Sequence, residues 1–162
     1  MTKRQPVYDI NEWLLNGTEV GALMGWPNPE GIRPFVPVQQ QPETNDRTSE
    51  NPYVVYSWRT IGGLDQWWVR TDEVTYVIWG RSVEQLSEIA NEIVDHLIAL
   101  DESAQDLMEY LGHTGRNLEW VFHYIRVVGS FSPDPASQEA GRLGWIVTFR
   151  YEYSPVNGKH IG

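Results

Sequence analysis

The chain has 162 residues, the length of one ordinary domain, which can bury a core without stabilisation by disulfide bonds or a structural metal. It contains no cysteine, which excludes a disulfide framework, a zinc-thiolate site and a cysteine nucleophile. The 22 acidic and 12 basic residues give a formal net charge of −10, and this charge argues against sequence-specific binding of nucleic acid because it repels phosphates. No apolar run has the length of a signal peptide or a membrane span, so we expect a soluble chain made and used in a cytoplasm.

The N-terminal part contains one short helical pattern and one long polar segment. In YDINEWLLNG, Asp9 is a candidate N-cap, the apolar residues have helical spacing, and Gly17 ends the pattern, which predicts a short helix. Residues 21–49 are rich in proline, glycine and polar side chains. We expect a loop there, in which only FVPVQQ (35–40) could join a sheet, at its edge.

Two β-rich segments follow, PYVVYSWRT (52–60) and QWWVRTDEVTYVIWG (66–80). The connection IGGLD is short and contains two glycines, so the pair predicts an antiparallel hairpin. Thr71, Asp72 and Glu73 interrupt the second segment, which predicts a bulge or a kink within that strand.

The period of the apolar residues changes at Ser82, where SVEQLSEIANEIVDHLIALD begins. Ser82 and Gln85 form a capping-box pattern. The apolar positions that follow recur at helical spacing: Val83, Leu86, Ile89, Ala90, Ile93, Val94, Leu97 and Leu100. This pattern predicts one long amphipathic helix whose apolar stripe lies in the core.

The C-terminal part predicts a second, shorter helix in ESAQDLMEYLG (102–112) and two strands, in LEWVFHYIRVVGSF (118–131) and GWIVTFRYEY (144–153). We therefore expect one α+β domain over residues 1–162, with a mostly antiparallel sheet, one long amphipathic helix packed across one face and a short N-terminal helix. Polar loops are expected near 41–50 and 132–141.

No motif predicts catalysis. Asp72 and Glu73 are adjacent, so in a strand they point to opposite faces and cannot act as an acid and base pair; loop chemistry explains them better. Gly62 and Gly63 indicate a turn and lack the lysine and helix of a phosphate loop. The histidines have no metal-binding spacing: His96, His113, His123 and His160. We expect no enzyme activity, no cofactor and no metal.

Acidic residues recur on one side of the long predicted helix. Glu84, Glu88 and Glu92 are spaced four apart, with Asp95 beside them, and like charges at this spacing destabilise a helix. We call these four residues the acidic ridge. One interpretation is a solvated outer face. The other is a functional surface, which faces either a molecule that must not bind to it or a basic patch on a partner.

The segment from Asn51 to about Leu100 carries a family resemblance. Its motifs are NPYVVYS, followed by TDEVTYVIWG, which leads into RSVEQLSEIANEIVDHL. The order of these motifs, taken with the N-terminal helix, the proline-rich loop and the terminal strands, resembles that of the tail terminator (tail completion or tail-to-head joining) proteins of long-tailed bacteriophages. The segments QWWVR and the linker before GRLGW match no pattern of that family.

The resemblance implies a structural virion protein. Its copies would form a ring, by this resemblance a homohexamer, on the head-proximal end of the tail tube, ending tube polymerisation and joining tail to head. It implies as partners the tail tube protein, a head-side connector or neck protein and, in a contractile tail, a sheath or sheath-end protein. DNA would pass through the ring without specific binding. The chain would lie in the tail or neck of the virion, and in the host cytoplasm during assembly.

The acidic ridge would then face the lumen of the ring, where negative charge lets phosphates pass. The expected assembly contacts are Trp67, Trp68, Asp134, Gln138 and Arg142. Two alternatives stay open. One is a head-side neck or connector (head completion) subunit. The other is a small ligand-binding or hydrolase domain, which would need a concave pocket with convergent polar groups.

Overall fold

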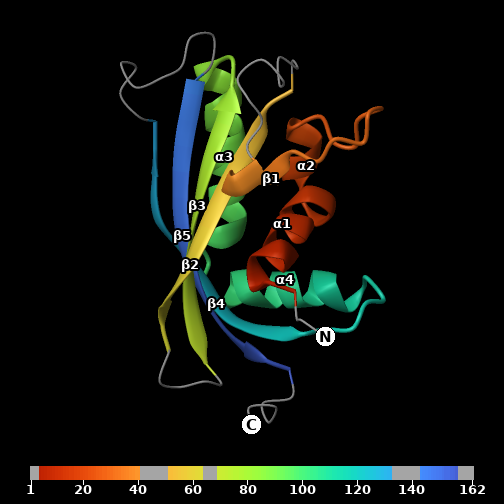
Figure 1. Cartoon of the computed structure of the whole chain (residues 1–162), viewed down its shortest axis with the longest axis vertical. Helices are drawn as coiled ribbons and strands as arrows, with labels where there is room; N and C mark the ends of the chain where they lie inside the picture. The colour runs from red at the N-terminus through yellow and green to blue at the C-terminus, as the bar shows by residue number, and fades with distance from the viewer. Residues whose placement is uncertain (1–3, 41–50, 64–68, 133–142, 157–162) are drawn as a thin grey trace.

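The computed structural model describes residues 4–40, 51–63, 69–132 and 143–156. Within these ranges the chain forms a five-stranded sheet and four α-helices, and the helices lie over one face of the sheet (Figure 1). The predicted α+β class is confirmed. No helix in these ranges is long and apolar enough to span a bilayer.

The strand order across the sheet is β1-β2-β3-β5-β4. The strands are β1 Phe35–Pro37, β2 Tyr53–Gly62, β3 Arg70–Gly80, β4 Trp120–Phe131 and β5 Leu143–Pro155. β1 pairs in parallel with β2, and the other three pairings are antiparallel, so the sheet is mixed but mostly antiparallel. The predicted edge position of the FVPVQQ segment is confirmed, and its last residues form a short 3₁₀ turn, η1 Val38–Gln40.

The predicted hairpin is also confirmed, because β2 and β3 pair in antiparallel register from Tyr53 with Trp79 to Gly62 with Thr71. The expected irregularity lies in the other strand. β3 pairs with β5 without a register shift, and the shift occurs in β2 between Thr60 and Gly62. An extra residue near the end of a hairpin strand increases its twist, which fits the crossing of these strands at the lower end of the sheet in Figure 1.

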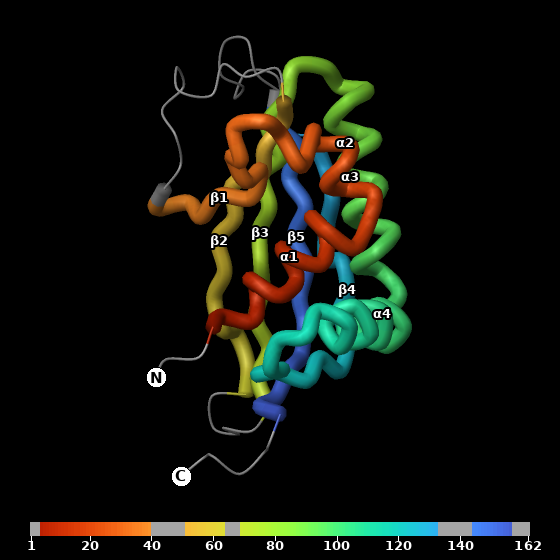
Figure 2. Tube along the Cα trace, turned by 90° about the vertical axis from the view of Figure 1, so that its right-hand side faces the viewer, coloured from red at the N-terminus to blue at the C-terminus, as the bar shows by residue number. Residues whose placement is uncertain are grey.

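The helical layer consists of α1 Pro6–Gly17, α2 Glu19–Leu23, α3 Val83–Leu97 and α4 Asp101–Gly112. The sheet is therefore covered by several helices and not by a single long one, and the shorter helix expected at 102–112 is present as α4. α3 ends at Leu97, and Leu100, which was expected in its apolar stripe, has a positive φ of 55° and an exposed side chain. Its backbone instead forms an isolated bridge with Ile125 of β4. The chain then turns into α4, which runs across the lower end of α3 (Figure 2).

The start of the first helix differs from the prediction. α1 begins at Pro6, a residue suited to the first turn because it needs no hydrogen-bond acceptor there. Asp9 is consequently not an N-cap but a buried residue within the helix. The segment from Gly21 was expected to be loop, yet α2 extends to Leu23, with the side chain of Thr18 accepting a hydrogen bond from the Val20 N–H.

The core lies between the helical layer and the inner face of the sheet. Ser82 caps α3 by accepting a hydrogen bond of 3.1 Å from the Gln85 N–H. The buried stripe of α3 consists of Leu86, Ile89, Ala90, Ile93 and Leu97. It packs on inner-face residues of β3 and β5, where the Tyr76 and Phe149 rings meet edge to face at 5.0 Å. The predicted core position is confirmed for these five residues of the stripe, whereas Val83 is exposed and Val94 is only partly buried.

Candidate assembly surfaces

The strands alternate between a buried inner face and a face that no described helix covers (Figure 1). In β3, Asp72, Val74, Tyr76 and Ile78 are buried, whereas the intervening residues are partly exposed. The same alternation holds in β5, as its sequence predicted. We call the uncovered side the open sheet face.

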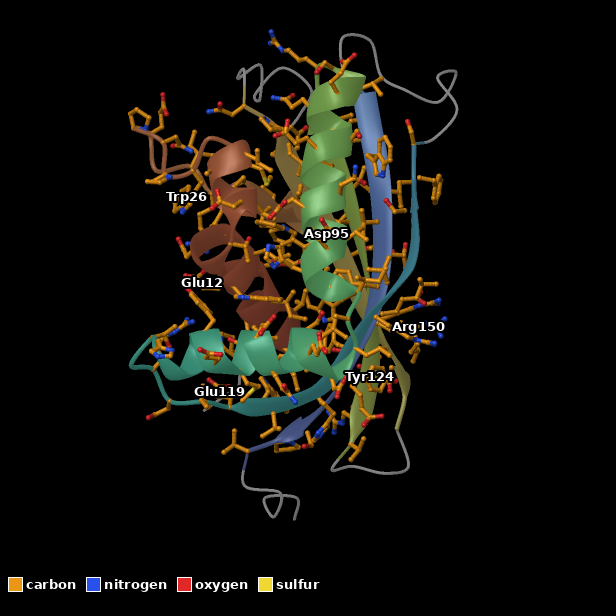
Figure 3. All side chains as sticks on the ribbon, turned by 180° about the vertical axis from the view of Figure 1, so that it is seen from behind. Glu12, Trp26, Asp95, Glu119, Tyr124 and Arg150 are labelled. Carbon is orange, nitrogen blue, oxygen red and sulfur yellow. The ribbon has the colours of Figure 1, made fainter. Side chains whose placement is uncertain are left out.

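The pairing register places four charged residues side by side across the open sheet face. Arg59 of β2 lies opposite Glu73 of β3, Glu73 opposite Arg150 of β5, and Arg150 opposite Arg126 of β4. We call these residues the arginine row. Figure 3 shows Arg150 projecting from the sheet on the side away from the helices.

Glu73 links two of the three arginines. Its carboxylate accepts hydrogen bonds from Arg150 Nε at 2.9 Å and from Arg59 Nη2 at 3.1 Å. These bonds, the one from Arg150 above all, lower the pKa of Glu73 below its ordinary value. Arg126 is exposed and forms no ion pair with a described residue. The row therefore carries a local positive charge on a chain whose net charge is −10.

A row of hydroxyl groups runs beside the arginine row. Ser57, Thr75 and Thr148 are in register across β2, β3 and β5, one step along the open sheet face. A small hollow of about 110 Å³ lies between the two rows, bordered by residues of β2 and β3 that include Ser57, Arg59 and Thr75. Hydroxyl and guanidinium groups side by side are donors suited to carboxylate or phosphate oxygens.

A second concave surface lies in the helical layer. The C-terminal end of α1, the last turn of α3 and the C-terminal half of α4 border a hollow of about 420 Å³. Its lining residues are Trp13, Gly17, Thr18, His96, Asp106, Glu109, Tyr110 and His113. We call it the acidic groove, because Asp106 and Glu109 are its exposed charged residues that form no ion pair with a described residue.

The acidic ridge lies on the side of α3 away from the sheet, where Figure 3 labels Asp95. Glu84, Glu88 and Asp95 are exposed within the subunit. Glu92 is half-buried, and its carboxylate lies 3.1 Å from Nε2 of His96, one turn further along the helix. The structure thus keeps the four residues on one helix, with one of them engaged by a histidine.

The other predicted contact residues lie outside the described residues. These are Trp67, Trp68, Asp134, Gln138 and Arg142. The same applies to His160, to the expected loop at 41–50, to all of the 132–141 loop except Ser132, and to the start of the QWWVR strand.

Asp72 is the most enclosed carboxyl group on the described strands, and its role was not foreseen. Its side chain accepts hydrogen bonds from the hydroxyls of Tyr151 at 2.8 Å, Tyr153 at 3.1 Å and Thr60 at 2.8 Å. Burial raises the pKa of Asp72, and these hydrogen bonds offset part of the rise. The residue belongs to a strand and not, as expected, to a loop; Glu73 points to the opposite face, as predicted.

A second buried carboxyl group fixes the chain before α1. Asp9 accepts a hydrogen bond of 2.8 Å from Arg4 Nε, and the Arg4 backbone N–H donates to Glu119 at 2.7 Å. Trp120 completes the contact by donating its indole N–H to the Arg4 carbonyl. Burial raises the pKa of Asp9 in spite of the arginine. These bonds hold α1 against the start of β4.

The remaining histidines are scattered. His113 lies 2.7 Å from the Glu109 carbonyl, and His123 lies 2.8 Å from the Ser154 hydroxyl. Among residues 4–40, 51–63, 69–132 and 143–156, no cluster of three or more histidine, aspartate or glutamate side chains could hold a metal ion.

The fold is a two-layer α+β sandwich in which helices cover one side of a mixed sheet (Figure 2). No protein-family model matches the sequence. No curated protein matches it either. The assignment of a function therefore depends on the surfaces of the molecule and on the resemblance described above.

Proposed function

We propose that this chain is a structural subunit of a long-tailed bacteriophage that forms a ring on the head-proximal end of the tail tube. In this position it ends tube polymerisation and provides the surface to which the head is joined. The copies of the chain contact one another, the tube protein on one side and a connector or neck protein on the other.

The open sheet face is the observation that carries this proposal. It extends over β2, β3, β5 and β4, lacks a described helical cover, and combines charged and hydroxyl groups with exposed apolar residues such as Phe131. A surface of this composition suits a protein interface, in which charged and polar groups fix the relative position of the two partners around the apolar contacts.

The order of the elements supports the same proposal. The resemblance to tail terminators runs from Asn51 to about Leu100, and that segment forms β2, β3 and α3 with a buried helix stripe against the sheet. A ring subunit needs such a rigid centre, because contacts on both sides of the ring depend on its shape. The acidic ridge on the outer side of α3 provides the negative surface for the lumen.

Tube growth in the presence of the purified chain tests the proposal. Tubes assembled from the tube protein of the same phage should stop elongating at one end once the chain is added. The length distribution should therefore narrow in electron micrographs. Unchanged elongation, together with binding to isolated portal complexes, would favour the head-side connector instead.

A further inference from the structure

We infer that the arginine row of one copy docks into the acidic groove of the next copy, so that successive subunits are joined head to tail. This inference rests on the proposed function, because it names the surfaces through which the ring would close. It concerns contacts between copies of this chain and not contacts with the tube or the head.

The arginine row contains three arginines and a single carboxylate, Glu73. Arg126 and Arg150 are directly opposite on neighbouring strands, a placement that is unfavourable for like charges. Glu73 engages Arg150 and Arg59, but Arg126 is left exposed at the end of the row. A carboxylate from outside the subunit, placed at Arg126, would relieve this repulsion and form a charge-assisted hydrogen bond.

The acidic groove has the complementary chemistry. Asp106 and Glu109 are exposed carboxylates on α4, three residues apart, so they lie on the same side of the helix. The half-buried ring of Tyr110 lines the same hollow of about 420 Å³. Carboxylates beside aromatic rings recognise a guanidinium group, which pairs with the former and stacks on the latter.

A second copy fits these surfaces better than a nucleic acid does. The chain carries a net charge of −10, and the arginine row itself contains Glu73, so a phosphate backbone would meet repulsion around a narrow positive strip. A helix face with two carboxylates is opposite to that strip in charge. The required face is present on the same chain.

The position of the two surfaces determines the kind of assembly. The arginine row is on the open sheet face, whereas the groove lies among α1, α3 and α4 in the layer on the other side of the sheet (Figure 2). Different surfaces on opposite sides give a heterologous contact, which repeats from copy to copy. Such a contact closes into a ring when the rotation between copies permits it.

A charge-exchange experiment tests the inference with the purified chain alone. Arg126→Glu removes the positive end of the row, and Asp106→Arg reverses the groove. Each variant should assemble at least about 10-fold less well than the wild type in sedimentation velocity at low salt. An equimolar mixture should recover the assembly, because the altered surface of each variant is complementary to that of the other.

Two substitutions outside the proposed contact serve as controls. Glu88→Arg changes the net charge as Asp106→Arg does, at an exposed residue of α3 that does not border the groove, and Arg81→Glu, at an exposed residue outside both surfaces, matches Arg126→Glu. Both should assemble like the wild type. Added salt should weaken the wild-type assembly, because it screens exposed charges.

The inference is overturned if the wild type stays monomeric up to about 1 mM, if either contact variant assembles normally, or if the mixture fails to recover. It is equally overturned if Arg126→Glu abolishes binding of a DNA oligonucleotide while self-assembly persists. In these cases a ring on tube ends would still support the proposed function, so the two ideas fail separately.

Discussion

The hydroxyl of Tyr151 donates a hydrogen bond of 2.8 Å to the buried carboxyl group of Asp72, its direct partner in the pairing of β5 with β3. The bond joins two central strands on the inner face, below the apolar core. Asp72 has an exposed fraction of 1 %, so water cannot replace a donor that is lost.

Tyr151→Phe should therefore destabilise the chain by about 1–3 kcal/mol, because a buried carboxyl group loses one of its three donors. Chemical denaturation measures this change in the free energy of unfolding. Tyr124→Phe is the matched control, since Tyr124 is half-buried on the open sheet face and its hydroxyl has no partner among the described residues. Equal effects of the two substitutions would contradict the assigned role of Asp72.

The pH dependence of stability should reveal Asp72 as well. Burial raises its pKa in the folded chain, so the folded state binds this proton more tightly than the unfolded state does. The resulting contribution to stability is fully present below the ordinary aspartate pKa of about 3.9 and is lost as the pH rises through the folded pKa.

Asp72→Asn removes this contribution and leaves that of Asp9 unchanged. The free energy of unfolding of the wild type minus that of Asp72→Asn should fall as the pH rises above the ordinary aspartate pKa of about 3.9. A difference that stays constant as the pH rises would show that Asp72 titrates alike in the folded and unfolded chains.

Leu97 provides a test of the core. Its side chain has an exposed fraction of 0 %, and Leu97→Ala should cost about 2–5 kcal/mol, because it loses apolar contact and leaves a cavity. The neighbouring Ile98 is 54 % exposed, and Ile98→Ala should change stability by less than about 0.5 kcal/mol. If Leu97→Ala left stability intact but abolished assembly, the stripe would belong to a subunit boundary.

The acidic ridge should matter for DNA passage and not for folding. Replacing Glu88 and Asp95 by lysine should change stability by less than about 0.5 kcal/mol, since both side chains are exposed and exposed helix charges contribute little. In assembled particles the double variant should slow genome release most at low ionic strength, where screening is weakest. The corresponding glutamines should have an intermediate effect. Release that is independent of charge at every salt concentration would leave the ridge as a solvated face.

Periodicity accounts for what the sequence could predict of the fold. The stripe from Leu86 to Leu97 and the alternation along β5 follow directly from apolar spacing, and both occur as expected. The break after α3 did not follow, because Leu100 continues the apolar spacing and only its positive φ and its bridge to Ile125 take it out of the helix. Tertiary contacts override local pattern at such a position.

The candidate surfaces were harder to predict for a related reason. The arginine row exists because residues far apart in sequence are in register, and β4 has irregularities between Phe122 and Tyr124 and between Val127 and Gly129 that shift its residues relative to β5. A shift of one residue moves a side chain to the opposite face, so the alignment of Arg126 with Arg150 depends on those irregularities. Asp72 was misplaced because its acceptor role depends on tyrosines in a distant strand.

Electron microscopy of the purified chain mixed with tail tubes of the same phage tests the proposed function most directly. The account predicts closed rings of this chain at one end of each tube, with the other end and the tube wall free. A chain that remains monomeric, leaves both tube ends bare and binds portal complexes instead would contradict it.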